Sequence, residues 1–266
     1  MEMRFEKSSF GKRLGSMLKV DFRRMFTTRF LYIMVGICLA MPILMLVMTT
    51  SLGGTTVNPT TGVETTMDTF TNTWQAIGTV SGETNPMAMG LTTMCNINML
   101  YFFIAVLVCV FVADDFRSGY SKNIFAVRAG KADYVISKTI VCFAGCALMF
   151  LGFFVGAVLG GAIAGLPFDT GTAGTTGVMM CMLSKLGMVA VFVGIDFAVS
   201  AATKGKTWMS IVGSMVAAML LYMMVPMVTP LDSGIMNVIL CFAAGGLICV
   251  GLGAVSCQVL KRTSLV

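Results

Sequence analysis

The chain has 266 residues, of which 57% are hydrophobic and only 11% charged, with a net charge of +6 and no histidine. Soluble globular domains carry about 25% charged residues, so this composition excludes an ordinary water-soluble enzyme and a nucleic-acid-binding protein, and indicates an integral membrane protein. The missing histidine also excludes Ser-His catalysis and His-ligated zinc or haem.

The first 29 residues are basic and contain an apolar stripe. Apolar side chains recur there at steps of three or four: Phe10, Leu14, Met17, Leu18, Phe22, Met25 and Phe26. This spacing predicts an amphipathic elbow helix in the cytoplasmic interface of the membrane, with its basic face near anionic lipid headgroups. The alternative is a basic juxtamembrane tail that only satisfies the positive-inside rule.

Six apolar windows follow, and each is long enough to cross a membrane, which takes about 20 mostly apolar residues. The windows are Phe30–Thr49, Leu91–Ala113, Thr139–Ala164, Val178–Ala201, Met209–Val228 and Ile235–Leu260. The expected fold is therefore all-α, with a cytoplasmic segment (1–29), a six-span bundle (30–260) and a cytoplasmic tail (261–266) in one domain. No soluble domain fits beside these spans, so we expect any energy-coupling domain on another chain.

The distribution of charge predicts the orientation of the spans. Seventeen of the 18 Lys and Arg residues lie in the segments 1–29, 114–138, 202–208 and 261–266. The alternate loops hold no Lys or Arg and carry acidic residues instead: Glu64, Asp68, Glu83, Asp169 and Asp232. By the positive-inside rule, both termini are predicted to lie in the cytoplasm.

The segment 114–138 has the most specific pattern. An acidic pair, Asp114 and Asp115, closes the second window, and Gly119 follows it. Ile124 and Phe125 then predict a short helix whose apolar face is exposed, which would form a docking element for a soluble partner. The alternative is that this face packs on neighbouring spans.

The same segment continues into a basic-x-x-Tyr-x-x-Ser-Lys pattern, formed by Lys131, Tyr134, Ser137 and Lys138 at the start of the third span. With the acidic pair, the glycine and the short apolar helix, this resembles the permease subunit of type-2 ATP-binding-cassette exporters. It is similar in particular to bacterial lantibiotic and bacitracin immunity and export permeases. Members of that family often have Ser-Arg where this chain has Gly130 and Lys131.

The resemblance implies a multi-pass permease of the bacterial cell membrane that exports an amphiphilic substrate such as an antimicrobial peptide or drug. It implies pairing with a second permease copy or a paralogue, and binding of cytoplasmic ATPase subunits through the 114–138 segment. ATP and Mg would be bound by those subunits, so the chain itself is expected to be neither an enzyme nor a cofactor-binding protein. A non-transporting membrane scaffold or regulatory subunit is the rival from another class.

Two charges, Lys185 and Asp196, lie well inside a predicted span. Eleven residues of helix place them on one face about 16 Å apart, too far for an ion pair. They are candidates for the lining of a translocation path. Alternatively, Lys185 snorkels outward and Asp196 caps cytoplasmic contacts.

Methionines recur every fourth residue in the fifth window: Met215, Met219, Met223 and Met227. They are candidates for an adaptable surface on the same path, or for the lining of a metal or ion transporter that needs no ATPase. The alternative is apolar filler that faces lipid.

Glycines also recur every fourth residue in the third window, at Gly152, Gly156 and Gly160. Small residues at this spacing predict close helix packing, either within the chain or across a dimer.

Overall fold

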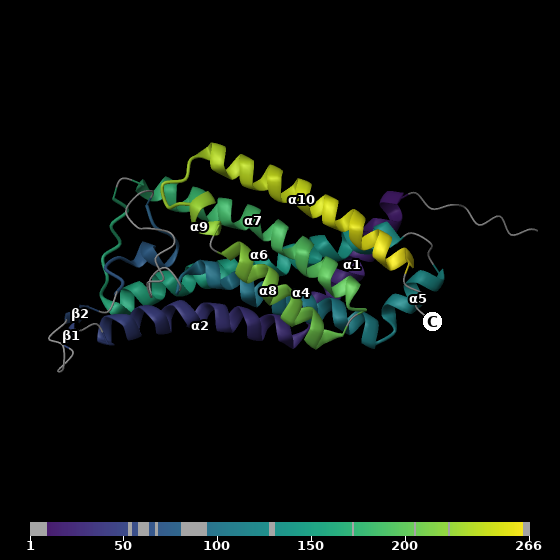
Figure 1. Ribbon diagram of the computed structural model, residues 1–266, viewed down its shortest axis with the longest axis horizontal. Coiled ribbons are helices and arrows are strands. Elements are labelled where there is room, and N and C mark those ends of the chain that lie inside the picture. Colours follow the sequence, from purple (N-terminus) through teal and green to yellow (C-terminus); the bar gives the residue numbers. More distant parts are fainter. Residues whose placement is uncertain are drawn as a thin grey trace, which may run out of the picture.

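The computed structural model describes residues 10–52, 55–57, 64–66, 69–80, 95–127, 131–171, 173–204, 206–222 and 224–262. Long helices lie side by side in these ranges, with one pair of short antiparallel strands, β1 (Thr55–Val57) and β2 (Glu64–Thr66), at one end of the bundle (Figure 1). The helices are α1 (Phe10–Thr27), α2 (Arg29–Leu52), η1 (Thr73–Ala76), η2 (Ile97–Met99), α4 (Leu100–Arg117), α5 (Tyr120–Val127), α6 (Lys131–Ala164), α7 (Gly174–Ala202), α8 (Thr207–Tyr222), α9 (Val225–Val228) and α10 (Ile235–Arg262).

Five of these helical segments are long and apolar enough to cross a membrane: α2, η2 with α4, α6, α7 and α10. They confirm long apolar helices in five of the six predicted windows and indicate a multi-pass membrane protein. The first four residues of the second window, 91–94, lie outside the described residues, and its helical segment covers Ile97–Arg117. The longest, α6, has 34 residues and extends about 51 Å, whereas the hydrocarbon core is about 30 Å thick. The helix is therefore longer than one crossing requires, and it begins eight residues before the predicted start at Thr139.

The fifth predicted window differs from expectation. A continuous helix over Met209–Val228 is replaced by α8, which has 16 residues and ends at Tyr222, and by the short α9. Pro226 lies in the first turn of α9, where its missing N–H is tolerated. Because α8 alone extends only about 24 Å, six membrane crossings and their orientation stay a prediction.

The two ends of the bundle differ in composition. Helices α1 and α5 and the C-terminal end of α10 lie at one end, and the strands and α9 lie at the other (Figure 1). The first end holds basic residues of α1, α5 and α10, such as Arg24, Lys122 and Lys261.

The glycine stripe of α6 faces α2 of the same chain, which resolves the two alternatives that its spacing left open. A Cβ added to Gly152 would lie 3.2 Å from Val35, and one added to Gly160 would lie 2.8 Å from the Cα of Ile43. A Cβ on Gly156 would collide with the carbonyl oxygen of Leu39. The stripe therefore serves packing within the chain.

All nine cysteines are free, and six of them are buried as small apolar residues of the bundle: Cys38, Cys109, Cys142, Cys146, Cys181 and Cys241.

Candidate functional site

Helix α1 packs on the bundle through one face. Met17, Asp21 and Met25 are buried on it at a spacing of four residues, which places them on the same side of a helix. Phe10 and Phe26, two members of the predicted apolar stripe, remain exposed. A helix in this segment is confirmed, and its position in the membrane interface stays a prediction.

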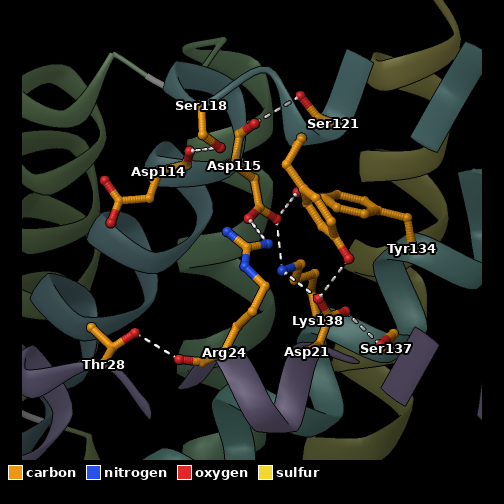
Figure 2. A network of polar contacts seen from close by, with 11 residues as sticks. Asp21, Arg24, Thr28, Asp114, Asp115, Ser118, Ser121, Tyr134, Ser137 and Lys138 are labelled. Carbon is orange, nitrogen blue, oxygen red and sulfur yellow. Dashed lines mark hydrogen bonds and ion pairs between the residues drawn. The ribbon is translucent and has the colours of Figure 1, made fainter. Parts of the chain in front are cut away.

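Asp21 enters a buried network of charges between α1, α4 and α6 (Figure 2). The ammonium nitrogen of Lys138 lies 2.8 Å from Asp21 Oδ1 and 2.7 Å from Asp115 Oδ2. These are ion pairs whose angles fall outside hydrogen-bond geometry. Arg24 Nη1 donates a hydrogen bond to Asp115 Oδ1 over 2.7 Å. The side chains of Lys138, Asp21 and Asp115 are fully buried.

Hydroxyl groups complete the network. Tyr134 donates to Asp115 Oδ2 over 2.9 Å, and Ser137 donates to Asp21 Oδ2 over 2.7 Å. Each of the four carboxylate oxygens therefore has a partner, and two carboxylates balance two cations. A buried charge pair of this kind contributes little net stability when intact, but removing one partner costs about 3–5 kcal/mol.

Aromatic rings enclose the two cations. The ammonium nitrogen of Lys138 lies 4.3 Å from the ring centre of Phe111, and the Arg24 guanidinium lies 4.0 Å from that of Tyr120. Burial acts to lower the pKa of Arg24, but the Asp115 carboxylate outweighs it and the pKa is raised. Burial raises the pKa of Tyr120. At neutral pH, the guanidinium is therefore charged and the phenol neutral.

The predicted 114–138 segment is divided between this network and the surface. Asp115 is buried, whereas Asp114 is exposed. Gly119 joins α4 to α5 with a φ of +72°, a left-handed conformation that favours glycine. The structure confirms a short helix after it.

The apolar face of α5 is turned onto the bundle instead of being exposed. Ile124 and Phe125 are half-buried and pack against the core. The ring of Phe125 meets that of Tyr134 edge-on, with 5.2 Å between centres. The expectation of an exposed apolar face is therefore wrong, because the start of α6 covers it.

Lys131 connects α6 to α10. Its ammonium group donates a hydrogen bond to the carbonyl of Leu260, near the C-terminal end of α10. A cation at this position also interacts favourably with the helix dipole. Arg128, Ala129 and Gly130, which join α5 to α6, lie outside the described residues.

Lys185 is fully buried within the bundle. Its ammonium nitrogen donates to Asn98 Oδ1 over 2.8 Å and to Thr229 Oγ1 over 3.0 Å. Tyr101 donates to the backbone carbonyl of Lys185 over 3.0 Å. The alternative in which Lys185 snorkels outward is therefore wrong, since its polar end is held by neutral side chains inside the protein.

Asp196 is also buried, with 1% of its surface exposed. Neither of its carboxylate oxygens has a hydrogen-bond partner among the described residues. The alternative in which Asp196 caps cytoplasmic contacts is therefore wrong. Lys185 and Asp196 lie on one buried helix face, as predicted.

The methionines of α8 lie on the exposed side of that helix. Met215 and Met219 have 37% and 68% of their surface exposed on the outside of the bundle. Met223 lies outside the described residues. Within the ranges that the structure describes, no three Cys, Asp or Glu side chains are placed to hold a metal ion.

Sequence reasoning missed the partners that the network recruits from elsewhere. Asp21 has a signal in retrospect, because it is the single acidic residue of α1 and lies in phase with Met17 and Met25. Asn98 and Thr229 have no such signal, because isolated polar residues near the ends of apolar windows are common.

Comparison with protein-family models, with curated proteins and with solved structures finds no match to this chain.

Proposed function

We propose that the chain is the permease subunit of an ATP-driven exporter of the type-2 ATP-binding-cassette class. In this proposal, six spans cross the bacterial cell membrane with both termini in the cytoplasm. The chain pairs with a second permease copy or a paralogue and moves an amphiphilic substrate, such as an antimicrobial peptide or drug. A separate ATPase subunit binds ATP and Mg and supplies the energy.

The observation that carries the proposal is the way α5 is attached. This eight-residue helix lies between two long apolar helices, at the end of the bundle where α1 also lies (Figure 1). Phe125 packs on Tyr134, and Ser121 donates a hydrogen bond to the backbone carbonyl of Asp115. A displacement of α5 would therefore be transmitted to α4 and α6 through these direct contacts, as energy coupling to a membrane bundle requires.

The outer side of α5 remains available to a partner. Lys122 and Asn123 are exposed, while Ser121 is buried. We assign the ATPase contact to this polar side, with the apolar side serving as the attachment to the bundle. This revises the docking role of Ile124 and Phe125, which hold α5 in place in the proposal.

Inside the bundle, Lys185 and Asp196 are the candidate lining of the translocation path. Buried charge in a membrane protein is costly and is usually retained for function. Alternating access would expose these groups in turn to the two sides, as ATP binding and hydrolysis on the partner displace α5.

The test is co-purification of the full-length chain from its own membranes with an ATPase subunit that carries an intact phosphate-binding loop. Lys122→Glu is compared with Lys261→Glu, because both replace an exposed lysine at the same end of the bundle. We expect Lys122→Glu to reduce the bound ATPase at least fivefold and Lys261→Glu to leave it unchanged.

Stimulation of ATP hydrolysis by added amphiphilic peptides then tests transport by the intact complex. Absence of any such ATPase would contradict the proposal. Equal binding by the two variants would move the contact away from α5. A bound ATPase that no peptide stimulates would favour a membrane scaffold or regulatory subunit.

A further inference from the structure

A second polar cluster surrounds Asp196 where α4, α7 and α8 meet. Ser200 lies one turn further along α7, and its hydroxyl also lacks a hydrogen-bond partner among the described residues. The hydroxyl of Ser214 on α8 faces the Asp196 carboxylate without hydrogen-bond geometry, and it contacts the sulfur of Cys109 on α4 over 3.2 Å.

In the part of the chain that the structure describes, no cation pairs with this carboxylate. The titratable groups of the neighbouring helices that interact electrostatically with it are thiols, from Cys109 on α4 and from Cys142 and Cys146 on α6. On α10, Cys249 packs beside Gly194, and on α8 the nearest titratable residue is Tyr222, eight residues beyond Ser214.

The two buried lysines are occupied elsewhere. Lys138 pairs with Asp21 and Asp115. Lys185 donates to Asn98 and Thr229, about 16 Å from Asp196 along α7.

An ionised carboxylate in this place would carry a large desolvation penalty with no compensating charge. Binding a proton removes the charge and needs no additional space. A metal ion would need several further ligands, and the described residues offer one carboxylate, two serine hydroxyls and the thiol of Cys109 here, without a third Cys, Asp or Glu placed to complete a site. The geometry therefore favours the proton over a metal cation.

We propose that Asp196 is a proton-binding site within the membrane bundle, loaded in the conformation described here and emptied when α8 separates from α4 and α7. Helix α8 suits this role because it covers the carboxylate with Ser214 while its other face, including Met219, is exposed. A proton would then move together with the conformational change. This goes beyond the proposed function, in which ATP alone supplies the energy.

The test is infrared spectroscopy of the purified full-length chain in a maltoside detergent, which has no carbonyl group. At neutral pH we expect a carbonyl stretching band from a protonated carboxylic acid, shifted by deuterium oxide and lost in Asp196→Asn. The matched control is Asp114→Asn, which removes an exposed carboxylate and leaves the band intact. Raising the pH should remove the band from the wild-type protein.

Carboxyl-¹³C aspartate provides a second assignment if Asp196→Asn does not fold, because the label shifts the band of an aspartic acid in the wild-type chain. Absence of a labelled band would overturn the proposal. A band that disappears when sodium or potassium is added at constant pH would overturn it in favour of a metal cation site. Neither measurement needs ATP, a partner or a substrate, so failure here is distinct from failure of the exporter proposal.

Discussion

Two buried polar regions of this molecule differ in how their charged side chains are paired. In the network of α1, α4 and α6, Lys138 and Arg24 meet the carboxylates of Asp21 and Asp115 directly. In the interior of α7, the ammonium group of Lys185 meets only neutral oxygens, and the Asp196 carboxylate makes no hydrogen bond and has no cation beside it among the described residues.

The difference indicates what each region is for. A network in which every charge is balanced holds helices in one arrangement, and α1 is held in this way. Charges kept without counter-ions do not stabilise a fold, because their desolvation is not compensated. Removing a charged group should therefore lower the free energy of unfolding strongly in the first region and weakly in the second.

The largest effect is expected for Lys138→Met. This change leaves the carboxylates of Asp21 and Asp115 buried without the ammonium group that pairs with both of them. The free energy of unfolding should therefore fall by about 3–5 kcal/mol. Thermal unfolding in detergent measures it, with Lys122→Met as the control because that lysine is exposed. A loss no larger than that of the control would show that the network is not structural.

A smaller loss is expected for Arg24→Met. Asp115 keeps Lys138 and Tyr134 as partners, and the Arg24 side chain is 31% exposed, so the change should cost about 2 kcal/mol. The same unfolding assay compares it with Arg23→Met, which removes an exposed neighbour. Equal stabilities of the two variants would argue against a contribution of the Arg24–Asp115 pair.

Lys185→Met should cost about 1 kcal/mol. Two neutral acceptors lose a donor, but the protein no longer has to bury a cation, and these contributions oppose each other. Export by the intact complex should nevertheless fall strongly if Lys185 lines the path. Unchanged export with a well-folded variant would remove this residue from the path.

The smallest effect on stability is expected for Asp196→Asn. If the carboxyl group carries a proton, an amide of the same shape replaces one neutral group with another, and the unfolding free energy should change by less than about 1 kcal/mol. Asp21→Asn is the matched comparison, since it makes the same chemical change in the balanced network. A similar cost at both positions would show that Asp196 has an ionic partner after all.

Part of this architecture could be predicted from the sequence. Hydropathy located α2, α6, α7 and α10 because long apolar runs have few alternatives to a membrane helix. The spacing of Asp115, Tyr134 and Lys138 drew attention to a segment whose side chains meet in space.

The remainder depends on tertiary contacts that spacing does not encode. Nothing in the 114–138 segment indicates that Asp21, more than 90 residues earlier, faces Lys138. The predicted orientation of the α5 apolar face was wrong because it too depends on a tertiary contact: the ring that covers Phe125 belongs to Tyr134 on α6. The interruption after α8 was missed because apolar composition does not distinguish a continuous helix from a broken one.

The glycine stripe of α6 has a mechanical consequence. Where Gly156 and Gly160 bring the backbone of α2 directly against α6, few side chains remain that could change rotamer and allow sliding. Helices α2 and α6 should therefore move together as one rigid unit. The glycine surface of α6 is already covered by α2 within the chain. In the proposed function, lipid or a second copy would meet other faces of the bundle, among them those of α8 and α10, where Met219, Leu247 and Val250 are largely exposed.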